Sequence, residues 1–374
     1  MRSSVAAIAA EVIRNAGSKR PADAALREVL KAKRDLFPTD AAEVSRLVFT
    51  HYRWHGWLRD ERTLEAKFRL ARKLQEQCRA DPASIPITEL RDKAVPAWVR
   101  QEMEIGDDWL RALQNEPKLW LRAKSGQGSV LAEKLYQTKP GKIPGALIYE
   151  GDRDLFKTTE FHAGEFEIQD VASQAVGLLC DPKPGETWWD ACAGEGGKLL
   201  HLSDLMQNKG LIWASDRAEW RLQKLKRRAA RAKVFNYRSA LWDGGEKLPT
   251  KTKFDGVLLD APCSGIGTWH RNPHARWTTT PNDVVELAEV QKRLLTNAAP
   301  SVKPGGKLIY AVCTLTQKET AGIAEAFSVS HPDFKPLLLP VEKIGLHRPC
   351  ATLTIWSQDL DGNGMFVAGW RLKS

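Results

Sequence analysis

From about residue 166 onward, short apolar segments alternate with helix-like segments, and this alternation restricts the possible folds more than any other feature. TWWDACA (187–193), LIWASD (211–216) and FDGVLLDAP (254–262) have the composition of buried strands. The segments 198–210 and 217–233 that lie between them have the pattern of helices. The order predicts an α/β domain with a doubly wound, largely parallel sheet, in which ligands bind at the carboxyl ends of the strands.

The first eighty residues show helical periodicity instead. Apolar residues recur at helical spacing in three stretches: Val5, Ile8 and Val12; Leu26, Val29 and Leu30; Val44, Leu47 and Val48. Asp40 is expected to cap the third helix, since Glu43 follows it by three residues. Residues 1–80 are therefore predicted to form an all-α domain.

The segment VFTHYRWHGWL (48–58) interleaves aromatic and basic residues. Trp54 and Trp57 are expected to face the core of the helical domain. The basic residues among the aromatic ones, namely His51, Arg53, His55 and Arg59, could face RNA.

The stretch from 81 to 165 is less regular. Its first part, DPASIPITELRDKAVPAWV (81–99), is punctuated by proline and is predicted to be a linker. LWLRAK (119–124) and GALIYEG (145–151) are predicted to be short strands of a small α/β appendage. The expected domains are therefore 1–80, helical; 81–165, linker and appendage; and 166–374, the catalytic α/β domain.

The overall charge favours a polyanionic partner such as RNA, although a basic surface that binds nothing would look the same. The 374 residues carry a formal net charge of +10. The six cysteines form no CxxC pair and no zinc-type spacing, which indicates reduced thiols and no metal. No apolar run approaches the roughly 20 residues that span a bilayer. We expect a cytoplasmic monomer with no membrane partner.

A glycine-rich loop, DACAGEGGKLL (190–200), follows the first strand of the α/β domain. A phosphate-binding P-loop would need glycine at 192 and serine or threonine at 199, but the chain has Cys192 and Leu199. A dinucleotide fingerprint fails at Leu199 as well. Both of these motifs are therefore excluded. The glycine-rich loop is expected to let a ligand approach the backbone at a helix N-terminus, with Asp190 holding the loop in place.

Acidic residues follow the next two strands. Asp216 ends LIWASD and suits a ribose diol, although it could also cap the following helix. Asp243 could reach the amino group of an adenine. These acids and the glycine loop indicate an adenosine cofactor without phosphates, for which S-adenosylmethionine is the best fit.

Two cysteines lie at the ends of two strands. Cys263 follows the strand that ends at Asp260, and Cys313 ends KLIYAVC (307–313). A lone cysteine is more often a small buried apolar residue, but two at neighbouring strand ends suggest chemistry. Carbon 5 of cytosine is too weak a nucleophile to accept a methyl group until a thiolate adds to carbon 6. Asp260 could then hold the base, and Lys198 could lower the pKa of the attacking thiol.

Four motifs resemble those of the Nol/Nop/Sun-type (Sun/Fmu-like) RNA cytosine-5 methyltransferases: DACAGEGGK, DAPCSGIGTWHRNPHARW, LIYAVCTLTQKE and GEFEIQDVASQ. The first eighty residues resemble the NusB-like domain that precedes the catalytic domain in members acting on bacterial small-subunit ribosomal RNA. The resemblance implies that Cys313 is the nucleophile and that Cys263 assists product release. It places Arg271 and Trp277 near RNA. It places S-adenosylmethionine on the glycine loop and three acids, namely Cys192, Ala193, Gly194, Glu195, Gly196, Gly197, Lys198, Asp216, Asp243 and Asp260.

The chain departs from the family pattern at several positions. Glu195 occupies the position of a proline, Leu199 that of a threonine, and Val312 replaces the threonine before the nucleophile. Two alternatives therefore stay open: a methyltransferase of transfer RNA, and an RNA-binding assembly factor with a degenerate cofactor site. The segment 217–233, with eight Lys or Arg residues, either contacts phosphates or is a solvated helix face.

Overall fold

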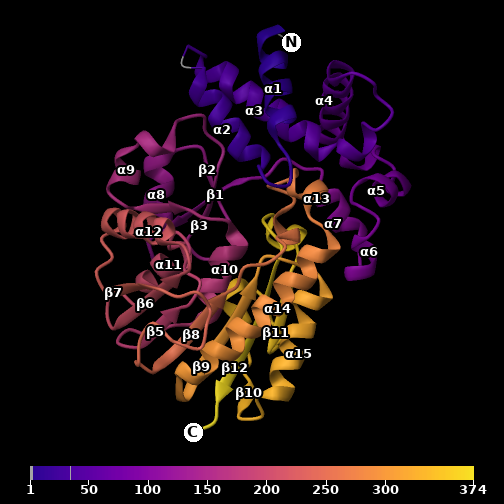
Figure 1. Ribbon diagram of the computed structural model, residues 1–374. Coiled ribbons are helices and arrows are strands. Elements are labelled where there is room, and N and C mark those ends of the chain that lie inside the picture. The colour runs from indigo at the N-terminus through magenta and orange to yellow at the C-terminus, as the bar shows by residue number, and fades with distance from the viewer. Residues whose placement is uncertain (1–2, 34) are drawn as a thin grey trace. The chain divides into compact units, whose positions relative to one another are not determined.

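The computed structural model describes residues 3–33 and 35–374, which form two compact units. The helical unit comprises the chain up to Pro117 together with Gly265–Asp283, and the sheet unit comprises Lys118–Ser264 and Val284–Ser374 (Figure 1). The predicted boundaries at 80 and 165 do not coincide with this division. Residues 81–117 group with the preceding helices, and the predicted appendage groups with the large sheet.

The helical unit contains four longer helices, α1 (Ser3–Asn15), α2 (Ala22–Ala32), α3 (Pro38–Arg53) and α4 (Leu64–Ala80). Shorter helices follow: α5 (Ile87–Lys93), α6 (Val99–Glu102), α7 (Asp107–Ala112) and, from the later segment, α13 (Ala275–Thr278). The predicted apolar stripes of α1, α2 and α3 form one core, which includes Val12, Val29 and Val48. The helices confirm the predicted periodicity, whereas the resemblance to NusB stays a prediction.

Three expectations for this unit are wrong. Asp40 does not cap α3, because the helix begins at Pro38, whose fixed φ suits the first helical position. The predicted linker contains α5, which packs through the buried Leu90. His51 and Arg53 are buried rather than facing solvent, and Arg53 donates a hydrogen bond to Gln75 of α4. Trp54 and Trp57 are buried as expected.

The predicted appendage is an antiparallel sheet with the strand order β2-β3-β1-β4. Its strands are β1 (Leu119–Ala123), β2 (Thr138–Pro140), β3 (Ala146–Tyr149) and β4 (Phe166–Ile168), accompanied by the helices α8 (Gly128–Leu135) and α9 (Thr159–His162). Trp120 of β1 joins the core of the large sheet and donates a hydrogen bond to the Asp361 carbonyl. This packing explains why the appendage belongs to the sheet unit.

The large sheet has the order β10-β12-β9-β8-β5-β6-β7, with β11 beside β12. The strands β5 (Thr187–Asp190), β6 (Leu211–Asp216), β7 (Tyr237–Leu241), β8 (Phe254–Asp260) and β9 (Val302–Val312) pair in parallel. The strands β10 (Phe334–Pro336), β11 (Thr352–Ile355) and β12 (Met365–Leu372) pair antiparallel. The strand order reverses between β5 and β8, which is where ligands bind in such sheets.

Helices cover both faces of this sheet, as a doubly wound fold requires (Figure 1). One face packs against α10 (Val171–Cys180), α11 (Gly197–Leu205) and α12 (Glu219–Ala232), and the other against α14 (Pro281–Ala298) and α15 (Ala321–Ser330). A short helix, α16 (Ser357–Leu360), precedes β12. Adjacent strand residues such as Trp188 and Trp189 enter opposite cores, as the period of a strand dictates. The predicted α/β architecture is confirmed.

Candidate active site

The glycine loop connects β5 to α11 through two residues with positive φ, Gly194 (+54°) and Gly196 (+87°). A Cβ on Gly196 would lie 2.7 Å from Cγ of Leu225 on α12, so a larger residue here would have to shift the Leu225 side chain and adopt a strained positive φ. The N–H of Ala193 donates to the carbonyl of Ser215 on β6. The loop is therefore anchored to the neighbouring strand and helix.

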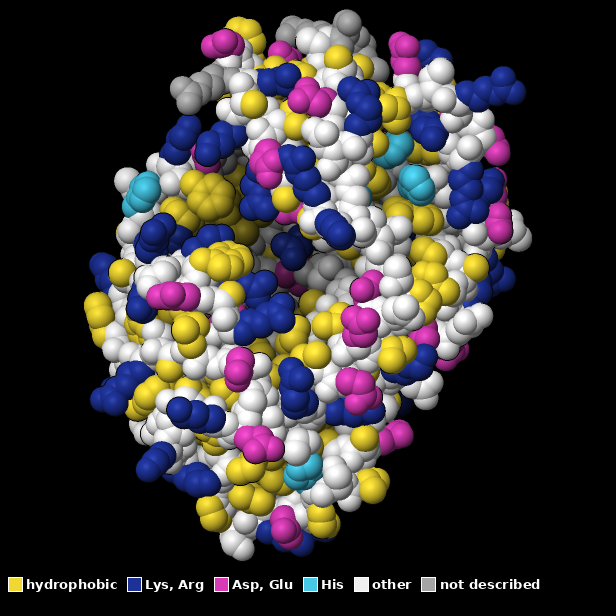
Figure 2. Space-filling model, viewed as in Figure 1, with side chains coloured by type: hydrophobic (Ala, Val, Ile, Leu, Met, Phe, Trp, Pro, Cys, Tyr) yellow, Lys and Arg dark blue, Asp and Glu magenta, His cyan; other side chains and the backbone are white. Residues whose placement is uncertain are grey.

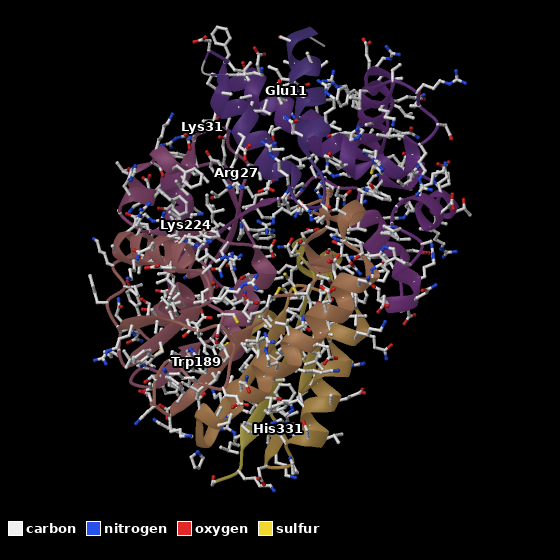
Figure 3. The ribbon with its side chains drawn as sticks, viewed as in Figure 1. Glu11, Arg27, Lys31, Trp189, Lys224 and His331 are labelled. Atoms are coloured by element: carbon white, nitrogen blue, oxygen red, sulfur yellow. The ribbon has the colours of Figure 1, made fainter. Side chains whose placement is uncertain are left out.

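Glu195, the residue that departs from the family pattern, forms an ion pair with Lys224 of α12 at 2.7 Å. Lys224 is labelled in Figure 3. Its backbone carbonyl accepts a hydrogen bond from Arg228. Lys224 thus lies where it can offset the extra negative charge in the loop.

Asp216, at the end of β6, links the glycine loop to the start of α12. Its Oδ2 accepts a hydrogen bond from the N–H of Gly194, and its Oδ1 accepts one from the N–H of Ala218. The N-cap position of α12 is Ala218, so Asp216 supports the helix start without being its N-cap residue. Each oxygen keeps a lone pair for a further donor.

A cavity of about 410 Å³ opens between these elements, entirely within the sheet unit. Every predicted cofactor residue except Gly196 lines it. Gly196 instead provides the close approach to Leu225. Sequence reasoning missed further lining residues from α10, α12, α14 and the segments after β6 and β7: Ser173, Arg217, Arg221, Trp242, Val290, Arg293 and Leu294. For Arg217, Arg221 and Trp242, the only sequence feature that could have indicated a place in the cavity is that they closely follow a strand. The residues from α10 and α14 do not have this feature.

Three charged groups meet at the base of this cavity. Lys198 Nζ lies 2.5 Å from Oδ2 of Asp260. Burial lowers the pKa of Lys198, but the attraction to Asp260, together with that to Asp190, outweighs burial, and the pKa of the lysine is raised. Burial, and then repulsion from Asp260, raise the pKa of Asp190 to about 7. Neither carboxylate oxygen of Asp190 accepts a well-formed hydrogen bond from the described residues.

The two cysteines at the strand ends lie together, with their Sγ atoms 3.2 Å apart. Cys313 directly follows β9, and Cys263 is three residues beyond the end of β8. These strands pair in parallel with Asp260 opposite Ala311, so their carboxyl ends meet at one edge. Both side chains are half-buried, and none of the six cysteines forms a disulfide in the described structure. Glu319, which sequence reasoning did not select, binds the residues that follow both cysteines.

The predicted RNA contacts Arg271 and Trp277 belong to the helical unit. Arg271 is exposed. Trp277 is half-buried, packs against the core of α1, α2 and α3, and donates its indole N–H to the Tyr52 carbonyl at 2.7 Å. The structure thus gives Trp277 a packing role, while its contact with RNA stays a prediction.

The basic helix α12 is partly engaged within the sheet unit. Arg228 and Arg231 both bind the buried Glu167 of β4. Trp220 is 56% exposed, with Arg221 and Lys224 within about 5 Å of its ring centre. Figure 2 shows dark blue Lys and Arg side chains spread over the viewed face, with acidic residues among them. The remaining exposed cations of α12 keep the hypothesis of phosphate contact open.

Two further expectations concern absences. Within residues 3–33 and 35–374 no group of three or more acidic, His or Cys side chains is arranged to hold a metal ion. In the same residues, no helix combines the length and the apolar character that crossing a membrane requires.

The doubly wound sheet, the glycine loop and the acid-lined cavity at the switch point define a Rossmann-like α/β methyltransferase domain. The sequence model of the 16S rRNA methyltransferase RsmB/F family matches residues 177–371, which is just over half of the chain. The chain therefore belongs to this family.

Curated relatives agree with this assignment over part of their length. A probable ribosomal RNA small subunit methyltransferase B from Synechocystis sp. is 41% identical over 180 residues, which are 47% of this chain and 40% of the relative. Its counterpart in Bacillus subtilis is 37% identical over 57% of this chain and 49% of the relative. The corresponding protein of Thermus thermophilus is 35% identical over 55% and 49%. The matched region thus spans less than half the length of these relatives.

Solved structures share the fold. PH0851 superposes with a TM-score of 0.78 and 24% identity over 98% of both chains. A methyltransferase homolog protein from Pyrococcus horikoshii has a TM-score of 0.57 and 25% identity over 71% of this chain and 90% of its own. NSun6 from the same organism, solved with SFG, has a TM-score of 0.60 and 20% identity over 71% and 93%.

Proposed function

We propose that this chain is an S-adenosylmethionine-dependent RNA methyltransferase that methylates carbon 5 of a cytosine in small-subunit ribosomal RNA. The observation that carries the proposal is the pair of thiols, with sulfur atoms 3.2 Å apart, at the ends of adjacent strands. Neither cysteine lines the acidic cavity, but Cys263 directly follows Pro262, which does. Cys313 is two residues beyond Ala311, which pairs with the lining residue Asp260. The family and the names of the curated relatives support ribosomal RNA as the substrate.

The lining residues fit S-adenosylmethionine, which supplies an electrophilic methyl group when bound. Asp216 keeps acceptor capacity for ribose hydroxyls on both oxygens. Asp190 presents a buried carboxyl group to which no described side chain donates, and an ammonium group would complement it. Asp243 is exposed at the rim of the cavity and can accept a hydrogen bond from an adenine amino group.

The two thiols divide the chemistry at the pyrimidine. Sγ of Cys313, as thiolate, forms a bond to carbon 6, and the ring electrons move to carbon 5, which becomes nucleophilic. After methylation, Cys263 removes the proton from carbon 5, the bond between Sγ and carbon 6 breaks, and the aromatic ring is restored. Asp260 can accept a hydrogen bond from the 4-amino group of the base, and Lys198 holds that carboxylate. The choice of Cys313 as nucleophile rests on the family resemblance, because the strand geometry treats both thiols alike.

Single cysteine substitutions test this mechanism. We expect Cys313→Ala to abolish methyl transfer, because no bond to carbon 6 can form. We expect Cys263→Ala to accumulate a covalent protein–RNA adduct that survives a denaturing gel, because the proton on carbon 5 then stays in place. Cys350→Ala is the control, since Cys350 is also half-buried but lies before β11 and not beyond the ends of β8 and β9. Unchanged methylation and no adduct in both active-site variants would overturn the proposal.

One observation keeps an alternative open, namely an RNA-binding assembly factor without activity. Glu195 stands where the family has proline, although Lys224 lies where it can offset the charge. Calorimetry with S-adenosylmethionine decides between the two: detectable binding at millimolar concentration supports the methyltransferase, and none supports the assembly factor. Bisulfite sequencing of total RNA from a deletion strain then identifies the substrate. One lost position in ribosomal RNA is expected, and a lost position in transfer RNA would reassign the target.

A further inference from the structure

The residue that joins the two cysteine loops is Glu319, in the 3-10 turn Gln317–Glu319 after β9. Its side chain is fully buried, with 0% exposure. Oε1 accepts hydrogen bonds from the N–H of Ser264 at 2.8 Å and from Gln291 at 2.9 Å. Oε2 accepts from three hydroxyl groups, those of Ser264 at 2.5 Å, Thr316 at 2.9 Å and Thr314 at 3.1 Å. One carboxylate therefore receives five donors.

Two of these partners directly follow the reactive thiols in the chain. Ser264 is bonded to Cys263, and Thr314 is bonded to Cys313. Their hydroxyl oxygens also lie 2.8 Å from each other. The residue that follows each cysteine is therefore bound to the same Glu319 carboxylate.

Helix α14 and strand β9 provide further hydrogen bonds to Glu319. Gln291 of α14 donates to both Glu319 and the carbonyl of Pro262, the residue before Cys263. The hydroxyl of Tyr310 on β9 donates to the backbone carbonyl of Glu319. The residues next to both cysteines are therefore part of one buried hydrogen-bond network.

We propose that Glu319 is a positioning residue that sets the separation of the Cys263 and Cys313 sulfur atoms, so that both can reach one base. The proposal rests on the proposed two-thiol function, because the spacing matters only if both thiols act on the same ring. Glu319 acts through Ser264 and Thr314. A displacement of about 1 Å in a reacting group can cost on the order of a hundredfold in rate.

Glu319→Gln is the sharpest variant, since it keeps the shape but replaces one acceptor oxygen with an NH₂ donor. The NH₂ group can donate to at most two of the three hydroxyl groups, and neither the Ser264 N–H nor the Gln291 NH₂ can accept, so at least one of the five contacts is lost. We expect the loops to separate as a result. We expect kcat for RNA methylation to fall about a hundredfold while KM for RNA changes less than about threefold. Affinity for S-adenosylmethionine, measured by calorimetry, should change less than about twofold, because Glu319 does not line the cavity.

A second readout measures the thiol separation without RNA. Treatment with diamide oxidises two adjacent thiols to a disulfide, and the reagent takes up both hydrogens to become the hydrazine. We expect the disulfide between Cys263 and Cys313 to form about tenfold more slowly in Glu319→Gln than in the unaltered protein, as followed by peptide mass spectrometry. Ser301→Ala is the control, because it removes another buried hydrogen bond of the sheet unit, from Ser301 to Ala298, that involves neither cysteine.

The outcomes separate the two proposals. Slow disulfide formation in Glu319→Gln, with no RNA methylated even by the unaltered protein, would support the positioning role and reject the proposed function. Disulfide formation and kcat within about twofold of the unaltered protein would overturn the positioning role, even if thermal stability fell as in Ser301→Ala. If Glu319→Gln fails to fold, Ser264→Ala decides by the same two measurements, since it removes the hydroxyl that donates to Glu319 and lies 2.8 Å from the Thr314 hydroxyl oxygen.

Discussion

Asp190 is a residue of the site that destabilises the folded protein when no ligand is bound. It is 1% exposed, next to Asp260, and its oxygens lack well-formed hydrogen bonds within the described structure. Its pKa of about 7 in the folded chain lies above the ordinary value of 3.8. The folded state therefore holds a proton that the unfolded state has released, and stability falls as the pH rises through this interval.

Asp190→Asn should remove this pH dependence. Without added cofactor, we expect the variant to become more stable relative to the unaltered protein as the pH rises. The difference in free energy of unfolding should grow by about 2 kcal/mol from about pH 5.5 to about pH 8. The gain should level off above the folded pKa of about 7. Urea denaturation of both proteins across this range checks the difference. A constant difference at all pH values would show that Asp190 does not titrate there.

At the residue scale, the sequence pointed to most of the site but not to Glu319. Cys263, Cys313 and Asp216 could be selected because each ends or follows a recognisable strand, and parallel strands end at one edge. Glu319 lies in a polar stretch, QKET, where an acidic residue looks like surface. Only the packing of Gln291 and Tyr310 around it shows that the carboxylate is buried.

Among the elements, the short helix α13 is held by a buried arginine. The guanidinium of Arg276 is 0% exposed and donates to the carbonyls of Arg53, Ala94 and Leu113. These residues lie at the C-terminal ends of α3, α5 and α7. A cation is favoured at helix C-termini, and here one cation serves three of them. Burial, and next the nearby Arg53, lower the pKa of Arg276 to about 9, so the side chain keeps its charge near neutral pH.

Arg276→Met should destabilise the helical unit. Methionine fills similar space but donates no hydrogen bond, so three buried carbonyl groups lose a donor. We expect a loss of about 3 kcal/mol or more, since each unsatisfied buried group costs on the order of 1–3 kcal/mol. Hydrogen exchange of amides in α3, α5 and α7 measures the effect. Arg271→Met, at an exposed neighbouring site, is the control and should change stability by less than about 0.5 kcal/mol.

The chain as a whole interleaves its two units. It leaves the sheet unit after Ser264, directly beyond Cys263, and returns at Val284. Between these points, Trp269, His274 and Arg276 are buried. Arg276 and Trp277 bind carbonyls of residues before 118. The segment that follows one reactive cysteine is therefore folded on the helical unit.

Removal of residues 1–117 should uncover this segment while leaving the cavity intact, because the cavity is lined by sheet-unit residues alone. We expect limited proteolysis of the 118–374 fragment to cleave between 265 and 283, where the intact protein resists. S-adenosylmethionine affinity should change much less than methylation of RNA. Resistance of the fragment to cleavage in this segment would show that it folds without the helical unit.

The sequence by itself determined the order of strands and helices from β5 to α15 and the residues at the ends of those strands, but not the antiparallel strands β10, β11 and β12. These follow from local periodicity and from parallel pairing, which act over a few residues or apply to any such sheet. The tertiary structure alone decided which charged and aromatic side chains are buried and which segments fold together. Arg276 and the Arg53 carbonyl lie 223 positions apart, and Ser264 and Glu319 lie 55 apart. Burial at such positions depends on neighbours that no local window contains, so Arg276 and Glu319 could be assigned only from the folded chain.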